Sequence, residues 1–166
     1  MKPQGNGEVP QPLPQLAGRH FAIVVARFYP DLTDWLLDGA QRALADCAVQ
    51  VDDIDVVDVP GCFEIPLACR KLTETERYDA IVALGVVVRG ETPHFDFVAG
   101  QCARGIMDVQ LATSIPIGFG VLTTENLAQA QERADPARGD KGYAAAIAAA
   151  TLVNIPTKLP RAGFRS

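Results

Sequence analysis

Histidine and cysteine, the side chains that most often bind zinc, are scarce in this sequence. Two histidines, His20 and His94, and four cysteines occur among 166 residues. No C-x-x-C pair is present, and each cysteine lies inside an apolar or helical pattern, which predicts buried free thiols in a reducing compartment. A zinc site needs clustered ligands, so we expect no metal site. The cysteines are Cys47, Cys62, Cys69 and Cys102.

Other signals are also missing. The net charge is −5, and without a basic excess the chain is not expected to bind nucleic acid. No apolar run reaches the roughly 18 residues that span a bilayer, and no secretory signal begins the chain. Neither G-x-G-x-x-G nor G-x-x-x-x-G-K-[ST] occurs, so dinucleotide and nucleoside triphosphate fingerprints are absent. Together these absences predict a cytoplasmic protein that does not act on membranes.

The chain does have the composition of one globular domain. Hydrophobic residues make up 48% of the sequence and charged residues 21%. Residues 1–18 are rich in proline, which predicts a flexible N-terminal arm that packs no core. Residues 156–166 show no periodicity, which predicts a loose C-terminal tail. The folded domain is therefore expected at 19–155.

Between these ends, short β-branched runs alternate with stretches of helical spacing. Ala80–Val88 contains no charge, which is typical of a strand buried on both faces of a parallel sheet. Asp31 is the expected N-cap of the first helix, and Pro116 is expected at the start of the last strand or on a sheet edge. The pattern predicts strands at 20–26, 54–59, 80–88 and 115–122, and helices at 31–48, 63–72, 95–111, 125–134 and 140–153.

This β-α-β-α-β-α-β-α-α order predicts an α/β fold, in which a four-stranded parallel sheet lies between two layers of helices. In such folds ligands bind beyond the carboxyl ends of the strands. The loops at those ends are 27–30, 60–64, 89–96 and 123–126.

His94, in the loop after the buried strand, is the leading candidate for acid–base chemistry. Imidazole has an unperturbed pKa of about 6.5, which suits proton transfer near neutrality. Gly90 would let the backbone approach a ligand closely, and free N–H groups at the start of the next helix would favour a phosphate. The alternative is that His94 only caps the helix or bonds a carbonyl, but its place at a strand end favours a function.

The remaining candidates also have ordinary explanations. Arg133 and Lys141 flank a glycine-containing turn, which suits a phosphate site, although both could be solvated charges. Phe28 and Phe119 lie on the expected ligand side, where aromatic residues are still more often part of the core. Glu64 lies at a helix N-terminus, where the helix dipole alone would explain a carboxylate.

Three blocks of sequence closely resemble lumazine synthase, the enzyme family of the penultimate step of riboflavin biosynthesis. The blocks are VPGCFEIPL at 59–67, RGETPHFD at 89–96 and FGVLTTEN at 119–126. Gln129, Glu132-Arg133 and the DKG run at 140–142 follow the same pattern. The resemblance extends from about 21 to 153, and its R-G-E-T-x-H-[FY]-D block is highly specific.

The resemblance implies a flavodoxin-like three-layer sandwich that forms a homopentamer with active sites at subunit interfaces. A higher assembly and an association with riboflavin synthase are left open. The implied enzyme is a transferase that condenses 5-amino-6-(D-ribitylamino)uracil with 3,4-dihydroxy-2-butanone 4-phosphate. The products are 6,7-dimethyl-8-ribityllumazine, phosphate and water. Imine formation, phosphate elimination and ring closure need proton transfers only, so no cofactor is implied.

The resemblance also implies roles for individual residues. His94 corresponds to the family's proton donor. Residues that would contact the pyrimidine and its ribityl chain are Phe28, Cys62, Phe63, Glu64, Val86, Val87, Val88 and, from a neighbouring subunit, Phe119. Residues that would contact the phosphorylated ketone are Glu91, Thr92, Arg133 and Lys141.

Four features depart from the family pattern. Tyr29 stands where Asn is common, which would alter the rim of the pocket, and Cys62 replaces a small Ala in a contact made mainly by the backbone. Asp140 replaces the usual Asn before Lys-Gly, which would weaken the attraction for phosphate slightly. Residues 135–138 differ from the turn that influences shell assembly, so free pentamers and sixty-subunit shells both stay open.

Two other functions fit the same scaffold. A non-catalytic flavin- or lumazine-binding paralogue would keep Phe28 but could dispense with His94 and Arg133, which are both present. A purely structural shell protein would need neither cation nor histidine. The fold cannot separate these functions from catalysis, because function depends on the site.

Overall fold

The computed structural model describes residues 12–156, and a parallel sheet forms its centre. Its four strands follow the order β2-β1-β3-β4, and every neighbouring pair is parallel. This arrangement confirms the expected four-stranded parallel sheet. The strands are β1 (Phe21–Ala26), β2 (Ile54–Val59), β3 (Ala80–Val88) and β4 (Ile117–Thr124).

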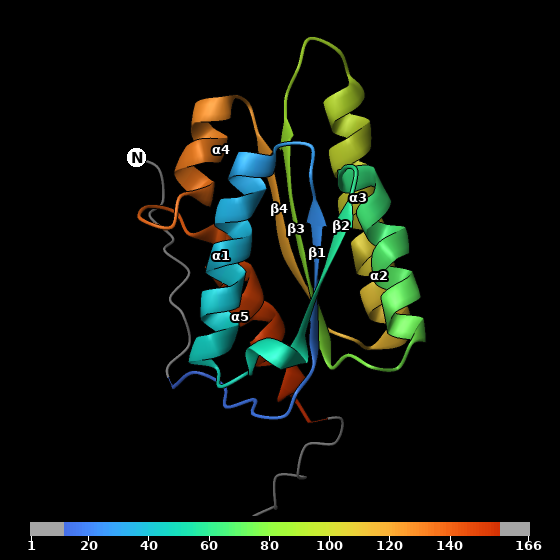
Figure 1. The fold of residues 1–166 in the computed structure, drawn as a ribbon. Helices are drawn as coiled ribbons and strands as arrows, with labels where there is room; N and C mark the ends of the chain where they lie inside the picture. The colour runs from blue at the N-terminus through green and yellow to red at the C-terminus, as the bar shows by residue number, and fades with distance from the viewer. Residues whose placement is uncertain (1–11, 157–166) are drawn as a thin grey trace, which may run out of the picture.

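Helices cover both faces of the sheet, which gives the expected three layers (Figure 1). One face carries α1 (Pro30–Asp46), α4 (Leu127–Ala134) and α5 (Lys141–Val153). The other carries α2 (Ile65–Glu74) and α3 (His94–Thr113). Parallel strands need long crossovers, and these helices supply them. Within the part of the chain that the structure describes, no helix is both long and apolar enough to cross a membrane.

Side chains of the two central strands alternate between two apolar cores, one on each face of the sheet. Phe21, Ile23 and Val25 of β1 pack into the core beneath α1 and α5. Ala22 and Val24 point the opposite way, toward α2 and α3. Successive side chains of a strand point to opposite faces, so a strand covered on both sides must be apolar throughout. This requirement explains the uncharged runs in the sequence.

The first helix shows where a local prediction was wrong. Asp31 is not the N-cap: the helix begins at Pro30, Tyr29 occupies the N-cap position, and no side chain caps the end. Proline at the first helical position has a suitable fixed φ and lacks an N–H that would need a partner. Asp31 instead places its carboxylate in the first turn, where the helix dipole favours it.

Several other boundaries differ by one or two residues from the expected ones. A 3-10 turn, η2 (Cys62–Glu64), precedes α2, where the sequence pattern predicted one helix from 63. The last strand begins two residues later than expected, directly after Pro116, and lies at the edge of the sheet. The Pro116 carbonyl accepts the N–H of Ile81 at 2.9 Å, so proline enters the ladder only as an acceptor.

The end of the expected N-terminal arm does pack against the domain. Leu16 is buried in the core beneath α1, and its N–H donates to the Cys47 carbonyl at 2.8 Å. The prediction of an arm that packs no core is therefore wrong at Leu16. The rest of that arm, up to residue 11, and the tail from 157 onward lie outside the described residues.

Glycine lets α1 and α5 approach each other closely. A Cβ atom added to Gly142, in the first turn of α5, would overlap the backbone carbonyl oxygen of Leu36 in α1. Backbone atoms cannot move aside as a side-chain tip can, so the two helices would have to separate. Gly100 in α3 offers a matched contrast, because nothing lies within 4 Å of the corresponding Cβ position.

We expect Gly142→Ala to destabilise the protein and Gly100→Ala to leave it unchanged or more stable. Overpacking costs about 1–3 kcal/mol, which should lower the thermal unfolding midpoint by roughly 2–12 °C for a chain of this size. Gly→Ala without strain stabilises by about 0.4–1 kcal/mol. Thermal unfolding followed by circular dichroism measures both variants, and equal midpoints for the two would contradict the proposed helix contact.

Candidate functional site

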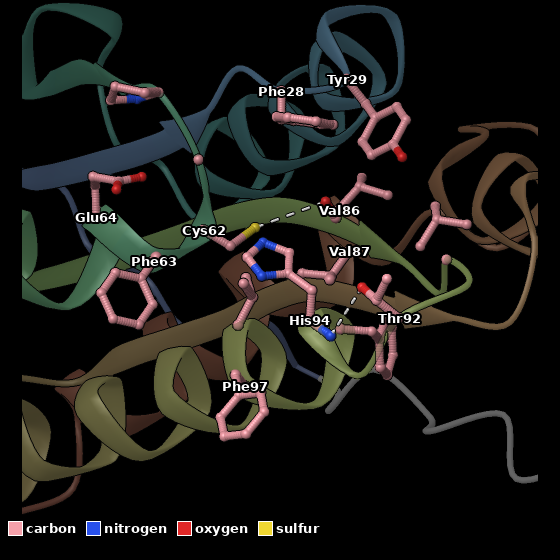
Figure 2. Close-up of a pocket in the computed structure, with 16 residues that line it drawn as sticks. Phe28, Tyr29, Cys62, Phe63, Glu64, Val86, Val87, Thr92, His94 and Phe97 are labelled. Atoms are coloured by element: carbon pink, nitrogen blue, oxygen red, sulfur yellow. Dashed lines mark hydrogen bonds between the residues drawn. The ribbon is translucent and has the colours of Figure 1, made fainter.

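An open cleft of about 640 Å³ lies beyond the carboxyl ends of β1, β2 and β3 (Figure 2). This is the position at which parallel α/β sheets bind ligands. The cleft brings together residues from four separate segments of the chain. The predicted residues that line it are Phe28, Cys62, Phe63, Glu64, Val86, Val87, Val88, Thr92 and His94.

His94 enters the cleft from the first residue of α3. Its backbone N–H donates to Thr92 Oγ1 at 3.4 Å, so the side chain of Thr92 helps to shape the start of the helix. The His94 side chain itself is exposed, and Figure 2 shows its imidazole projecting into the cleft. A histidine in this position can exchange protons with a bound molecule, whereas one that only capped the helix would point back at the backbone.

Arg89 holds the loop that carries His94, a role that the sequence did not reveal. Its Nε donates to Glu125 at 2.9 Å, and its guanidinium lies 4.3 Å from the ring centroid of Phe95. A further ion pair joins Arg89 to Asp96 at 3.3 Å. The arginine thus links the end of β3 to the first turn of α3 and to the loop after β4. Only the fold reveals these partners, because Glu125 is 36 positions away in sequence.

Cys62 lines the cleft, and its thiol is unreactive. The side chain is buried, and its Sγ lies 3.8 Å from the Val86 carbonyl oxygen. Burial raises the pKa of this thiol to about 11, so it stays protonated at neutral pH and is a poor nucleophile. A Cβ on Gly85 would lie 2.5 Å from the Cys62 sulfur, so glycine at position 85 makes room for the thiol.

The expectation of buried free thiols is confirmed for all four cysteines, Cys47, Cys62, Cys69 and Cys102. Burial raises the pKa of both Cys69 and Cys102 to about 12. Within residues 12–156, no group of three His, Cys, Asp or Glu side chains is placed so that it could hold a metal ion.

Exposed aromatic side chains surround the cleft. Phe28 is 72% exposed, Phe63 60% and Phe97 66%, although large apolar side chains are usually buried. Such rings offer flat surfaces on which a planar heterocycle can stack. Phe97 could not be predicted from the sequence, because one phenylalanine on an amphipathic helix carries no signal of its own. The loop of Phe28 is held by Arg27, which pairs with Asp58 at 2.8 Å and with Asp34 at 2.6 Å.

The other predicted residues do not join this cleft. Phe119, Arg133 and Lys141 line a second pocket of about 410 Å³, which is formed by β4, α4 and α5. Glu91 lines neither cavity. Within one chain the structure therefore divides the predicted site into an aromatic part with His94 and a cationic part with Arg133.

The second pocket contains two cations without carboxylate partners. Each of the other arginines in residues 12–156 forms an ion pair, but Arg133 forms none with a described residue, and neither does Lys141. The turn between α4 and α5 brings the two residues to one pocket: the Gly139 N–H donates to the Glu132 carbonyl at 3.0 Å, and Asp140 N–H to that of Asp135 at 3.1 Å. Two free cations on a pocket wall can bind an anion such as phosphate.

Comparison with known proteins agrees with this geometry. The family model described as 6,7-dimethyl-8-ribityllumazine synthase matches residues 18–157. A 6,7-dimethyl-8-ribityllumazine synthase from Desulfotalea psychrophila (strain LSv54 / DSM 12343) is 49% identical over 138 residues, which cover 83% of this chain and 89% of the relative. Because these similarities extend over most of both proteins, the chain belongs to the 6,7-dimethyl-8-ribityllumazine synthase family.

Proposed function

We propose that this protein is the riboflavin-biosynthetic enzyme that joins 5-amino-6-(D-ribitylamino)uracil to 3,4-dihydroxy-2-butanone 4-phosphate. The product is 6,7-dimethyl-8-ribityllumazine, and phosphate and water are released. The observation that carries the proposal is the cleft itself, in which a member of this family places an exposed histidine among exposed aromatic rings. The test is to mix the purified protein with both substrates and to follow the fluorescent lumazine product. No product at any protein concentration would favour the non-catalytic paralogue.

His94 would carry protons through the reaction. The amine of the pyrimidine attacks the ketone, and loss of water gives an imine, which needs a proton on the departing oxygen. Removal of a carbon-bound proton then expels phosphate, and ring closure releases a second water. Each step moves protons from a nitrogen or carbon atom to a leaving oxygen or to a group that can carry them. The imidazole of His94 projects into that space, where it can donate protons to a bound molecule and accept them from it.

Holding the two substrates together would supply much of the rate. Phe28 would stack on the pyrimidine, and Phe63, Glu64 and the backbone of Val86–Val88 would hold the ring edge and the ribityl chain. Correct placement of two reactants can lower a barrier by roughly 7–11 kcal/mol. The phosphate of the ketone would bind the cationic pocket of Arg133 and Lys141, together with the backbone near Glu91 and Thr92.

A complete site would need two chains. The aromatic cleft with His94 and the pocket with Arg133 are separate cavities that share no lining residue. In a symmetric ring every interface is the same head-to-tail contact, so the cleft of one subunit can meet the cationic pocket of the next at each interface. We therefore infer a cytoplasmic homopentamer with one shared site per interface.

His94→Ala should slow turnover without unfolding the protein, because its side chain is exposed. A positioned acid–base group is typically worth about 10²–10⁴-fold, and we expect a loss near the lower end, since water and the leaving phosphate can also carry protons. Steady-state kinetics with both substrates saturating measures the effect. An unchanged kcat would remove His94 from the mechanism.

Arg133→Ala should mainly weaken binding of the phosphorylated ketone. Losing a charge-assisted hydrogen bond costs about 1.5–3 kcal/mol, which corresponds to a roughly ten- to hundredfold rise in the KM of the phosphorylated ketone. The KM of the pyrimidine should change much less. Arg138→Ala is the matched control, because Arg138 lies in the turn that follows α4 but pairs with Asp135 and does not line the pocket. Equal rises in both KM values would contradict the phosphate role of Arg133.

Two nearly inactive variants should restore activity when they assemble together. One combines His94→Ala with Glu64→Ala, and the other combines Phe119→Ala with Arg133→Ala. Unfolding them together and refolding the mixture would create rings that contain both variants. At some interfaces the intact His94 cleft of one variant would then meet the intact Arg133 pocket of the other. A tag on one variant and size-exclusion chromatography identify mixed rings. Mixed rings that stay inactive would mean that each site is built within a single chain.

A further inference from the structure

Asp140 carries a negative charge one residue before a cation of the second pocket. It directly precedes Lys141, which lines that pocket with Arg133 and begins α5. Asp140 also adopts a left-handed backbone conformation, with φ at 44°, which aspartate tolerates better than most residues. A free carboxylate at this position would oppose the binding of a phosphate.

The carboxylate is not free, because Arg42 of α1 binds both of its oxygens. The Nη2 of Arg42 lies 2.9 Å from Oδ1 and 3.1 Å from Oδ2 of Asp140. The same guanidinium donates from Nε to Asp38 at 2.8 Å and lies 5.7 Å from the ring centroid of Tyr143. The hydrogen bond to Asp140, and then that to Asp38, raises the pKa of Arg42 above its usual value, so the cation is retained.

The surface of α1 is shaped to receive this carboxylate. Gly39 lies one turn before Arg42, and a Cβ at Gly39 would lie 2.5 Å from Asp140 Oδ1. The side chain of Asp140 therefore occupies space that any larger residue at position 39 would fill. Next to it, the hydroxyl of Tyr143 donates to Asp46 at 2.8 Å, which further fixes the start of α5 against α1. The contact between Arg42 and Asp140 is thus part of a built interface between two helices.

We propose that Arg42 is a positioning residue for phosphate binding: by pairing with Asp140, it cancels a negative charge that would otherwise weaken the pocket of Arg133 and Lys141. The inference rests on the proposed function for the identity of the anion. Arg42 does not line the pocket, so its effect passes through Asp140. Because Arg42 also pairs with Asp38, it offsets the charge of Asp140 in part.

Inorganic phosphate tests this role on the assembled protein without need of catalysis. We expect Arg42→Gln to weaken phosphate binding by about three- to fivefold in calorimetric titration, which is the size of a partly exposed charge pair. The KM of the phosphorylated ketone should rise by the same factor, while that of the pyrimidine should not change. Arg70→Gln is the matched control, because Arg70 forms a comparable pair with Glu74 on α2 and lines neither cavity.

The double variant Arg42→Gln with Asp140→Asn shows whether Arg42 acts by offsetting the charge of Asp140 or by anchoring α5 to α1. Asparagine also tolerates the left-handed conformation and removes the negative charge, so phosphate binding should return to within about twofold of the original protein. If Arg42 only anchored α5, the double variant would bind as weakly as Arg42→Gln, and the proposal would be overturned. Asp140→Asn alone should bind phosphate at least as tightly as the original, and weaker binding would also overturn it. This single variant decides the matter even if Arg42→Gln fails to fold.

Arg133→Ala distinguishes failure of this inference from failure of the proposed function. If Arg133→Ala weakens phosphate binding but Arg42→Gln does not, then only the role of Arg42 is wrong. If neither variant changes phosphate binding, the second pocket is not the phosphate site, and both the inference and the assignment of Arg133 are wrong.

Discussion

Parallel pairing of β1 with both β2 and β3 is the constraint on which the rest of the structure depends. Ala26, the last residue of β1, lies beside Val59, the last residue of β2, and β3 is also parallel to β1. The carboxyl ends of all three strands therefore lie at the same end of the sheet. The loops that carry Phe28, Cys62 and His94 therefore meet at one cleft. The same pairing requires long crossovers, and the helices that form them bury both faces. The apolar cores on the two faces of the sheet thus hold in place the strand ends where ligands can bind.

Arginine residues hold the segments that lead into the site. Arg27 ties the end of β1 to β2 and α1, Arg89 ties the end of β3 to the first turn of α3, and Arg42 ties α1 to the start of α5. Exposed pairs of this kind add little to overall stability. Their contribution is geometric, because each guanidinium joins two or more segments of the chain and fixes how they lie relative to one another. Arg133 is the exception: it forms no ion pair with any residue of 12–156, and an unpaired guanidinium there is what the proposed phosphate site requires.

Local sequence patterns predicted the elements well and their ends less well. The run Ala80–Val88 was correct to the residue, because a strand buried on both faces excludes charge along its whole length. The start of α1 was wrong because Pro30 satisfies the first turn without a capping Asp31. Leu16 was missed because its burial depends on Cys47, which is far away in the chain. Phe97 had no local signal, and Arg89 lay in a motif block without a predicted role, since the roles of both come from neighbours that the fold supplies.

Patterns along the chain were enough to predict the order of strands and helices, the buried thiols, and the motif blocks that identify the family and contain the proposed acid–base residue. These properties are local, because periodicity and residue type act over a few positions of the chain. Only the tertiary structure decided that the predicted site residues fall into two cavities, and that Arg42 reaches Asp140 across 98 positions. Contacts between distant segments depend on how helices cross the sheet and how closely glycine lets them approach. No pattern along the chain records those distances.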